Sequence, residues 1–385
     1  MSRPKILVTF GTRPEAIKMF PVVDALRATD QFDTRVAVTA QHRELLDQVL
    51  QLAGILPDVD LDLMQQGQSL DELSARIVTR FGEALDREKP ERVLVHGDTL
   101  TTMMVTLACY FRRIPVGHVE AGLRSGDIYS PWPEEVNRRV TGVIADLHFA
   151  PTQIAADALT AETVDPANIF ITGNTVIDAL LATRRRIAAD PSMAPAIAEL
   201  QQRFAGKQII AVTAHRRENF GDGMRNIATA LSALAARDDV AIIYPVHPNP
   251  NVGGVMRAML GDYHNIALIE PLDYPNFVAM MEASRLILTD SGGVQEEAPS
   301  LGKPVLVMRD TTERPEGISA GTARLVATDP ERIVGEASKL LDDHVAYDAM
   351  SKAHNPYGDG QAAHRIVAAI AQRHGVGLEP ARLTA

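Results

Sequence analysis

The sequence predicts an α/β protein with two Rossmann-like domains that face a central cleft. Short apolar runs alternate with helical segments along most of the chain, a pattern typical of doubly wound parallel sheets. The length of 385 residues favours two domains, each large enough for its own hydrophobic core. In each half a buried strand runs directly into a basic turn, at residues 11–15 and 214–218, which indicates that the two halves share one plan.

The composition is that of a soluble globular enzyme and argues against several other classes. Hydrophobic residues make up 46% and charged residues 23% of the chain, and the net charge of −11 argues against a nucleic-acid partner. The single cysteine, Cys109, lies in an apolar run, which indicates a packed core thiol. The chain begins with a strand-like segment, and no apolar run is long enough to span a membrane. We therefore expect a cytoplasmic protein without a membrane partner.

The first strand, residues 5–10, leads into a basic turn and a helix that extends to about residue 28. Pro14 suits the first turn of that helix, which places Arg13 and Lys18 at or near its N-terminus. In parallel α/β sheets, ligands bind at this end of the strands. The alternative is that both residues are solvated surface cations.

Two carboxylates follow later strands of the first half. Asp98 comes after the strand at residues 93–96, and Glu120 comes after the strand at residues 115–119. Because both would lie at the carboxyl ends of parallel strands, we expect them to overlook one crevice. Asp98 could instead be a helix cap, whereas Glu120 has no obvious helix to cap.

A proline-rich loop leads to a third carboxylate, that of Glu134. Residues 125–139 form a long loop that ends in a helix, and Glu134 stands at the beginning of that helix. Glu134 and Glu135 could simply complement the helix dipole. If Glu134 instead lies beside Asp98 and Glu120, repulsion would raise the pKa of at least one carboxyl group, which suits proton transfer.

The crossover to the second domain is expected at Gly173. The predicted domains are residues 1–172, which carry the carboxylates, and residues 173–365, with a C-terminal helix and tail at 366–385. The sequence leaves open whether this last segment packs back on the first domain.

The second half contains a predicted anion site. A buried strand at residues 285–288 is followed by Asp290-Ser291-Gly292-Gly293 and then by a helix, whose unpaired N–H groups and dipole attract anions. Glu297, one turn into this helix, could accept the hydroxyls of a ribose. An ordinary strand–helix turn is the alternative. His215 follows another strand within a basic turn, where it is either a cleft residue or a satisfied structural histidine.

Several cofactor motifs are missing from the sequence. No G-x-G-x-x-G follows a strand, and no Tyr-x-x-x-Lys pair or Walker loop is present, which disfavours NAD-dependent sugar epimerases and short-chain dehydrogenases. No His and Cys residues have the spacing of a zinc site. We therefore expect catalysis without a metal or a redox cofactor.

Taken together, the motifs resemble those of the bacterial non-hydrolysing UDP-N-acetylglucosamine 2-epimerases. The resemblance implies a glycosyltransferase-B type of fold and reversible conversion of UDP-GlcNAc to UDP-ManNAc for surface polysaccharides, without a cofactor. The stretches that carry the resemblance span nearly the whole chain: FGTRPEAIKM (10–19), TAQHR (39–43), VLVHGDT (93–99), PVGHVEAGLRSGD (115–127), YSPWPEE (129–135), FITGNTVIDAL (170–180), TAHRREN (213–219), TDSGGVQEEAPSLGKPVLV (289–307) and RDTTERPEG (309–317).

The resemblance also implies roles for individual residues. Those expected to be catalytic are Asp98, Glu120, Glu134 and His215. Those expected to bind the substrate are Arg13, Lys18, Phe277, Ser291, Gly292, Gly293, Glu297 and Arg314. Those expected to bind a second UDP-GlcNAc as an allosteric activator are Gln41, Gln68, Arg216 and His247. A homodimer is expected, while Glu44, where some members carry glutamine, puts strict dependence on the activator in doubt.

The chemistry of the sugar suggests how such carboxylates would act. The C2 proton is not acidic, so the C1–O bond must break first and give oxocarbenium character, after which a carboxylate removes the proton and leaves UDP and 2-acetamidoglucal. Asp98 and Glu120 are the expected proton-handling pair, with Glu134 as a third acid/base or an electrostatic stabiliser. The alternatives are a glycosyltransferase of the same fold, a hydrolysing 2-epimerase and a non-catalytic UDP-sugar sensor.

Overall fold

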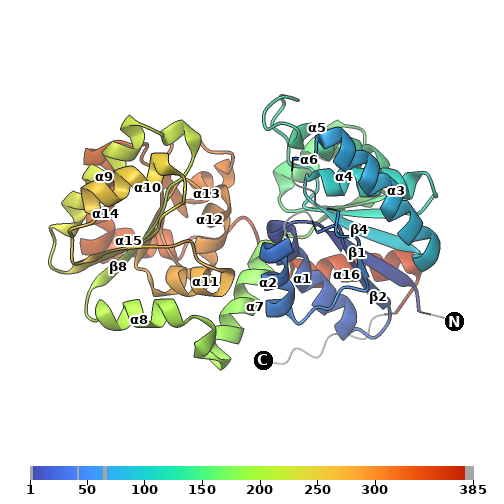
Figure 1. Ribbon diagram of the computed structural model, residues 1–385, viewed down its shortest axis with the longest axis horizontal. Coiled ribbons are helices and arrows are strands. Elements are labelled where there is room, and N and C mark those ends of the chain that lie inside the picture. The colour runs from blue at the N-terminus through green and yellow to red at the C-terminus, as the bar shows by residue number, and fades with distance from the viewer. Residues whose placement is uncertain (1–2, 41–42, 64–66, 378–385) are drawn as a thin grey trace. The chain divides into compact units, whose positions relative to one another are not determined.

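The chain forms two compact units. A computed structural model describes residues 3–40, 43–63 and 67–377, without the side chains of residues 43 and 44. Unit 1 comprises Met1–Ala179 and Gly358–Ala385, and unit 2 comprises Leu180–Tyr357. Each unit contains one parallel β-sheet with helices around it (Figure 1), so the predicted pair of Rossmann-like α/β domains is confirmed.

Unit 1 is built on a seven-stranded parallel sheet in the order β3-β2-β1-β4-β5-β6-β7. From β1 the chain adds strands towards β3 on one side, and from β4 it adds them towards β7 on the other. Doubly wound sheets bind ligands at the point between β1 and β4 where this order changes side. Its elements are β1 (Lys5–Phe10), α1 (Arg13–Ala28), β2 (Asp33–Val38), α2 (Arg43–Ala53), β3 (Val59–Asp60), α3 (Leu70–Glu88), β4 (Arg92–His96), α4 (Leu100–Tyr110), β5 (Val116–Val119), α5 (Glu134–Ile144), β6 (Leu147–Ala150), α6 (Gln153–Ala161), η1 (Pro166–Asn168), β7 (Ile169–Ile171), the start of α7 (Thr175–Ala189) and α16 (Ala362–His374).

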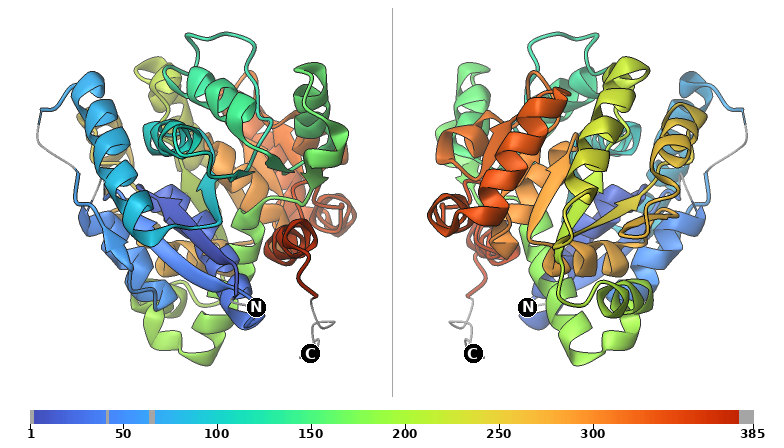
Figure 2. Two further views of the ribbon diagram at one scale, coloured as in Figure 1. Left: turned by 90° about the vertical axis from the view of Figure 1, so that its right-hand side faces the viewer. Right: turned by 90° about the vertical axis from the view of Figure 1, so that its left-hand side faces the viewer.

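Helices cover both faces of this sheet (Figure 2, left), with α3 in light blue on one side and α16 in dark red on the other. On the first side, Phe81 of α3 and Val105 of α4 pack with Val93 of β4 in one buried cluster. Cys109 belongs to the same cluster, so the predicted core thiol is confirmed, and burial raises the pKa of its thiol. On the other side, α16 packs against α1.

The C-terminal helix α16 belongs to unit 1, and a carboxylate of α7 caps its N-terminus. Asp178 in the first turn of α7 is buried, and its carboxylate accepts the backbone N–H groups of Ala362 and Ala363 at 3.2 and 2.9 Å. The chain therefore passes from unit 1 to unit 2 within α7 and returns at Gly358, whereas the sequence had suggested the boundaries 173 and 365. Figure 1 shows α16, drawn in red, among the blue elements of unit 1.

Unit 2 is built on a six-stranded parallel sheet in the order β10-β9-β8-β11-β12-β13. Its core joins the sheet to α9 and α14 through residues such as Val212, Leu231 and Leu340. The elements are η2 (Pro191–Met193), α8 (Pro195–Arg203), β8 (Gln208–Thr213), η3 (Arg217–Asn219), α9 (Asp222–Ala235), β9 (Val240–Pro245), α10 (Pro250–Leu260), β10 (Ile266–Ile269), α11 (Tyr274–Ala283), β11 (Leu286–Thr289), α12 (Gly292–Glu297), η4 (Ala298–Leu301), β12 (Val305–Val307), α13 (Pro315–Ala320), β13 (Ala323–Leu325), α14 (Pro330–Asp342) and α15 (His344–Ser351).

Among the residues that the structure describes, no helix is both long and apolar enough to cross a lipid bilayer.

Candidate active site

Glu120 is the centre of a cluster of polar side chains in unit 1. Lys18 Nζ lies 2.5 Å from Oε1 of Glu120, and Asn174 Nδ2 donates to the same oxygen at 2.8 Å. On the other side, His96 Nε2 lies 3.4 Å from Oε2. The Glu120 side chain is only 8% exposed, so the carboxylate is held in a largely buried setting with Lys18 as its cation. Lys18 is therefore part of a buried ion pair and is not a solvated surface cation.

The backbone at Glu120 adopts a conformation that side chains rarely take. Its φ is +61°, in the left-handed region, which costs a residue with a Cβ about 1–3 kcal/mol. Gly97, after β4, also has a positive φ of +65°, and a Cβ added there would lie 3.4 Å from Oε2 of Glu120. Such strain is concentrated at functional sites, because the surrounding structure must maintain it.

His96 was not singled out by the sequence patterns. It is the last residue of β4 and is buried, and neither ring nitrogen has a hydrogen-bond partner within the described part of the chain. Burial lowers its pKa to about 4, while the charge of Glu120 raises it and that of Lys18 lowers it. His96 is therefore neutral at pH 7. A polar residue closing an otherwise apolar strand was the signal that could have identified it.

Asp98 is held by an arginine from α5. Arg138 donates to Oδ2 of Asp98 through Nε at 2.9 Å and Nη2 at 2.6 Å. The cap of α4 is Thr99, whose side chain accepts the N–H of Thr102 at 3.2 Å. The suggestion that Asp98 is only a helix cap is therefore wrong. The charges of Asp98 and Glu120 both act on His96, so the two carboxylates share one neighbourhood.

Glu134 and Glu135 have different surroundings at the start of α5. Glu135 is fully buried and accepts Ser125 N at 3.0 Å, together with Arg138 and Arg139 at 3.1 Å each. Burial by itself would raise the pKa of Glu135, but these hydrogen bonds lower it overall. Glu135 is thus a structural anchor for the loop. Oε2 of Glu134, by contrast, is buried without a hydrogen-bond partner in the described residues.

Glu15 is a second residue that the sequence patterns did not single out. It is 2% exposed and accepts Gly11 N at 3.0 Å, Thr12 N at 2.8 Å and the Thr99 hydroxyl at 2.6 Å. Glu15 therefore ties the turn after β1 to the turn after β4. Burial is the main influence on its carboxyl group and raises the pKa. Arg13, at the start of the same helix, forms no ion pair in the described ranges.

In unit 2, the Asp290 carboxylate holds two turns together at the carboxyl ends of β8 and β11. Its side chain is completely buried, and Oδ2 accepts the backbone N–H groups of His215 and Arg216, each at 2.8 Å. The Asn219 amide donates to the same oxygen at 3.1 Å. One carboxylate thus fixes the basic turn after β8 against the Ser-Gly-Gly turn after β11.

The glycines of that turn leave room beside cationic groups. Ser291 is the N-cap residue of α12, and its side chain makes no capping bond. A Cβ added at Gly292 would meet Glu313 Oε1 at 3.6 Å, and Arg216 Nη2 and Arg314 Cζ at 3.9 Å. Arg216 is paired with Glu313 at 2.8 Å, and Arg314 with Glu296. A ligand that approaches the Gly292 backbone therefore meets two guanidinium groups together with the Glu313 carboxylate.

Glu297 faces α11 inside the same unit. It is 7% exposed, and its Oε2 accepts the hydroxyl of Tyr274 at 3.1 Å. Burial raises the pKa of Tyr274, so its hydroxyl remains a donor. Phe277 lies three positions further along α11 and is partly buried, on the same side of the helix as Tyr274.

His215 stacks on His247, with ring centroids 5.5 Å apart and planes inclined by 15°. Burial is the main cause of the lowered pKa of His215, and Asp290, 3.7 Å from Nδ1, opposes it. The lowered pKa favours the neutral imidazole at neutral pH. Of the expected activator residues, Gln68 accepts Arg76 Nη1 at 3.3 Å in unit 1, while Gln41 and the Glu44 side chain lie outside the described residues.

Comparisons with known proteins agree across both units. A protein-family model described as UDP-N-acetylglucosamine 2-epimerase matches residues 24–371. The UDP-N-acetylglucosamine 2-epimerase of Salmonella typhimurium is 56% identical over 369 residues, 95% of this chain and 98% of that protein. The enzyme of the same name from Escherichia coli K12 is 55% identical over 371 residues, again 95% and 98%. The crystal structure of UDP-GlcNAc 2-epimerase from Neisseria meningitidis bound to UDP-GlcNAc has a TM-score of 0.85 at 45% identity, covering 96% of this chain and 100% of that one. The expected fold type is confirmed.

Proposed function

Because this chain belongs to the UDP-N-acetylglucosamine 2-epimerase family, we propose that it interconverts UDP-GlcNAc and UDP-ManNAc at C2 without hydrolysis. The observation that carries the proposal is the largely buried carboxylate of Glu120, held by Lys18 and Asn174, with His96 3.4 Å away. A protein that only binds nucleotide sugars has no use for a strained, largely buried carboxylate beside a second one at Asp98.

The reaction begins with departure of UDP from C1. The C1–O bond breaks with its electron pair leaving on the diphosphate, and the sugar acquires oxocarbenium character that acidifies C2–H. A carboxylate then takes this proton, and the C–H electron pair forms the C1=C2 bond of 2-acetamidoglucal. UDP adds back after a proton has been delivered to the opposite face of C2, which inverts that centre.

We assign the proton transfers to carboxylates of unit 1. Glu120 and Asp98 are paired with Lys18 and Arg138, which stabilise the ionised forms that a base requires. Glu134, whose Oε2 has no hydrogen-bond partner among the described residues, is the third acid/base or the group that stabilises the cation. The neutral His96 does not compete as an acid.

We assign recognition of UDP to unit 2. The Gly292 and Gly293 backbone, with Arg216 and Arg314 nearby, suits the diphosphate and stabilises it as it departs. Preorganised donors of this kind each contribute about 3–4 kcal/mol to transition-state stabilisation. Ser291 and Glu297 suit the ribose, and Phe277 suits the uracil ring.

A regulatory role for a second UDP-GlcNAc is part of the proposal. Arg216 and His247 are the residues of unit 2 expected to contact this activator, together with Gln41 and Gln68 of unit 1. The stacking of His247 on His215 supports this, because it joins an expected activator contact directly to an expected catalytic residue. A homodimer is the proposed assembly.

A proton NMR time course with UDP-GlcNAc in D₂O, a metal chelator and no added cofactor tests the function. The expected result is growth of UDP-ManNAc with deuterium at C2 and no free sugar. Release of ManNAc and UDP would identify a hydrolysing 2-epimerase instead. An unchanged spectrum with a protein that binds UDP would reject the epimerase proposal.

A further inference from the structure

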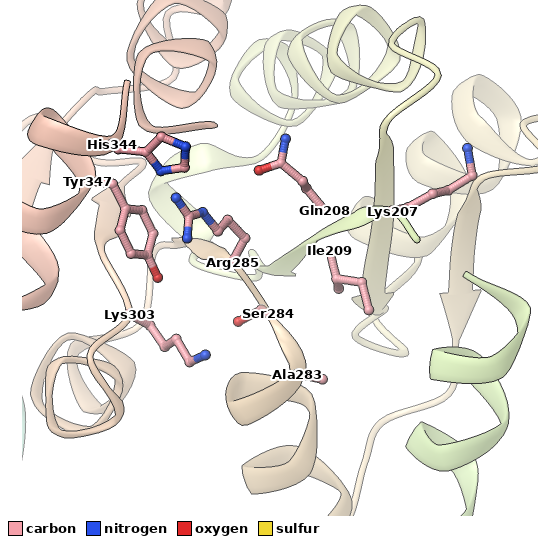
Figure 3. Close-up of a pocket in the computed structure, with 9 residues that line it drawn as sticks. All are labelled: Lys207, Gln208, Ile209, Ala283, Ser284, Arg285, Lys303, His344 and Tyr347. Carbon is pink, nitrogen blue, oxygen red and sulfur yellow. The ribbon is translucent and has the colours of Figure 1, made fainter. Parts of the chain in front are cut away.

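A polar pocket lies in unit 2 at the amino-terminal ends of three neighbouring strands (Figure 3). Gln208 opens β8, Arg285 precedes β11, and Lys303 stands two residues before β12. The pocket has a volume of about 430 Å³. We call it the strand-start pocket, and the lining residues that matter here are Lys207, Gln208, Arg285, Lys303, His344 and Tyr347.

The strand-start pocket is separate from the UDP region of the same unit. Asp290 and Ser291 follow the carboxyl end of β11, whereas Arg285 precedes its amino end. A four-residue strand such as β11 spans roughly 10 Å or more. The two regions therefore lie at opposite edges of one sheet.

Arg285 is held in place without a counter-ion. Its guanidinium carbon lies 3.4 Å from the centre of the Tyr347 ring, which fixes the side chain by a cation–π contact. Nε of Arg285 is buried and has no hydrogen-bond partner within the described residues. No carboxylate of the described chain forms an ion pair with Arg285. A positioned guanidinium is thus left with unused donors.

Lys303 is a second cation without a partner. Figure 3 shows its side chain entering the same space as Arg285 and Tyr347. It forms no ion pair or hydrogen bond through its ammonium group within the parts of the chain that the structure describes. Burial is the main cause of its lowered pKa; the charge of Glu282 opposes this shift, while those of Arg184 and Arg285 lower the pKa further. An anion in the pocket would raise the pKa of Lys303.

Each of the acidic groups nearby forms an ion pair with a different cation, although the charge of Glu282 also acts on Lys303. Glu282 pairs with Arg184 at 3.1 Å, and Asp348 pairs with Lys352 at 2.6 Å. At the far rim, Lys207 donates to the Asp238 carbonyl oxygen at 2.5 Å, and its ammonium lies apart from the others in Figure 3. The unbalanced charge of the pocket is therefore that of Arg285 and Lys303, even though the whole chain carries a net charge of −11.

We propose that the strand-start pocket binds a phosphate group, with Arg285 and Lys303 as its two principal ligands. Two cations that have no ion pair within the described residues match the charge of a phosphate, which lies between one and two negative charges at pH 7, whereas a carboxylate would balance only one. The planar guanidinium supplies directed donors and the lysine supplies a point charge, the usual combination for phosphate. A volume of about 430 Å³ falls within the roughly 300–1,000 Å³ of small-molecule sites, so a phosphate monoester fits as well as inorganic phosphate.

The test is a thermal-unfolding titration at pH 7 with inorganic phosphate, at constant ionic strength and with saturating UDP present. Wild-type protein is compared with Lys303→Gln and Arg285→Gln, and with Lys339→Gln as a control that removes an exposed lysine of the same unit outside the pocket. The midpoint should rise with phosphate in the wild type and the control. The apparent Kd should increase about ten-fold or more in each pocket variant, because each loses a charge-assisted hydrogen bond.

Phosphate that is merely excluded from the protein surface would raise the unfolding midpoint of all four proteins equally. An equal rise of the midpoint in Lys303→Gln and the wild type would therefore overturn the proposal. If a variant does not fold, the test becomes ³¹P line broadening of phosphate by the wild-type protein with UDP bound. Absence of broadening would then overturn the proposal. A parallel titration with glycerol phosphate separates the two sources, since a lower Kd than that of inorganic phosphate identifies a phosphate monoester. If the wild-type protein did not bind UDP, the proposed function would be contradicted. The comparison of phosphate affinity between the wild type and the pocket variants would still test the pocket.

Discussion

Lys18 Nζ lies 2.5 Å from Oε1 of Glu120, although the two residues are 102 positions apart. Lys18 comes from α1 and Glu120 follows β5, so the contact joins a helix to a strand end at the carboxyl edge of the sheet. The side chains are only 20% and 8% exposed, which protects the pair from screening by water. Four predictions follow from this cluster and from the turn at Gly292.

Replacing Lys18 with glutamine should destabilise unit 1 by about 3 kcal/mol, because a largely buried carboxylate loses its cation. Urea unfolding followed by circular dichroism measures the change. The double variant Lys18→Gln/Glu120→Gln should recover much of the loss, since it leaves no unpaired charge. Arg225→Gln, which breaks a pair with side chains 59% and 89% exposed, is the control. Equal losses in Lys18→Gln and Arg225→Gln would show that the Lys18 pair is not buried in solution.

Glu120→Gln should reduce epimerisation by at least about 10²-fold, because the amide cannot accept the C2 proton. UDP affinity, measured by calorimetry, should stay close to that of the wild type, since the proposed UDP groups belong to unit 2. The matched control is Glu83→Gln, which alters a half-exposed glutamate on α3. Turnover at the wild-type rate in Glu120→Gln would remove Glu120 from the mechanism.

The buried His96 should make the protein less stable in mild acid. Its pKa is about 4 in the folded chain and near 6.5 when unfolded, so the unfolded state binds more protons between these values. Stability should therefore fall as pH drops from 6.5 towards 4, with about 3 kcal/mol due to His96.

His96→Asn should flatten this part of the profile, measured as the free energy of unfolding in urea at pH 7, 6 and 5. The slope should not vanish, because burial also lowers the pKa of His118 to about 3. The exposed His354→Gln serves as the control. An unchanged profile in His96→Asn would mean that His96 is accessible to protons in the folded protein.

Gly292→Ala should fold normally but bind UDP about ten-fold more weakly, because the methyl group occupies the approach to the backbone N–H groups. The new Cβ would have ordinary contacts of 3.6–3.9 Å, so little change in Tm is expected. Gly335→Ala in α14, with no atom within 4 Å of the new Cβ, should leave UDP binding unchanged. Calorimetry with UDP decides, and equal affinities for both variants would place the diphosphate elsewhere.

Much of the candidate site was predictable because it depends on local order in the chain. A strand that ends in a turn places the next polar residue at the edge of the sheet, which identified Asp98, Glu120 and His215 without knowledge of any partner. The same local pattern identified the Ser-Gly-Gly turn. Adjacent residues were harder to separate: Glu134 and Glu135 both begin α5, and only packing makes Glu135 the buried anchor with three partners.

The sequence by itself determined two parallel α/β units, the strand ends that carry the polar residues and the family, because apolar periodicity and turn residues act over a few positions. The tertiary structure alone decided the pairing of Lys18 with Glu120 and of Arg138 with Asp98, and the return of α16 to unit 1. It also revealed the neutral His96, and Arg285 and Lys303 without ion pairs among the residues that the structure describes. These features depend on strand order and helix packing, which bring together side chains that are distant in the chain and set whether water or another charge surrounds them.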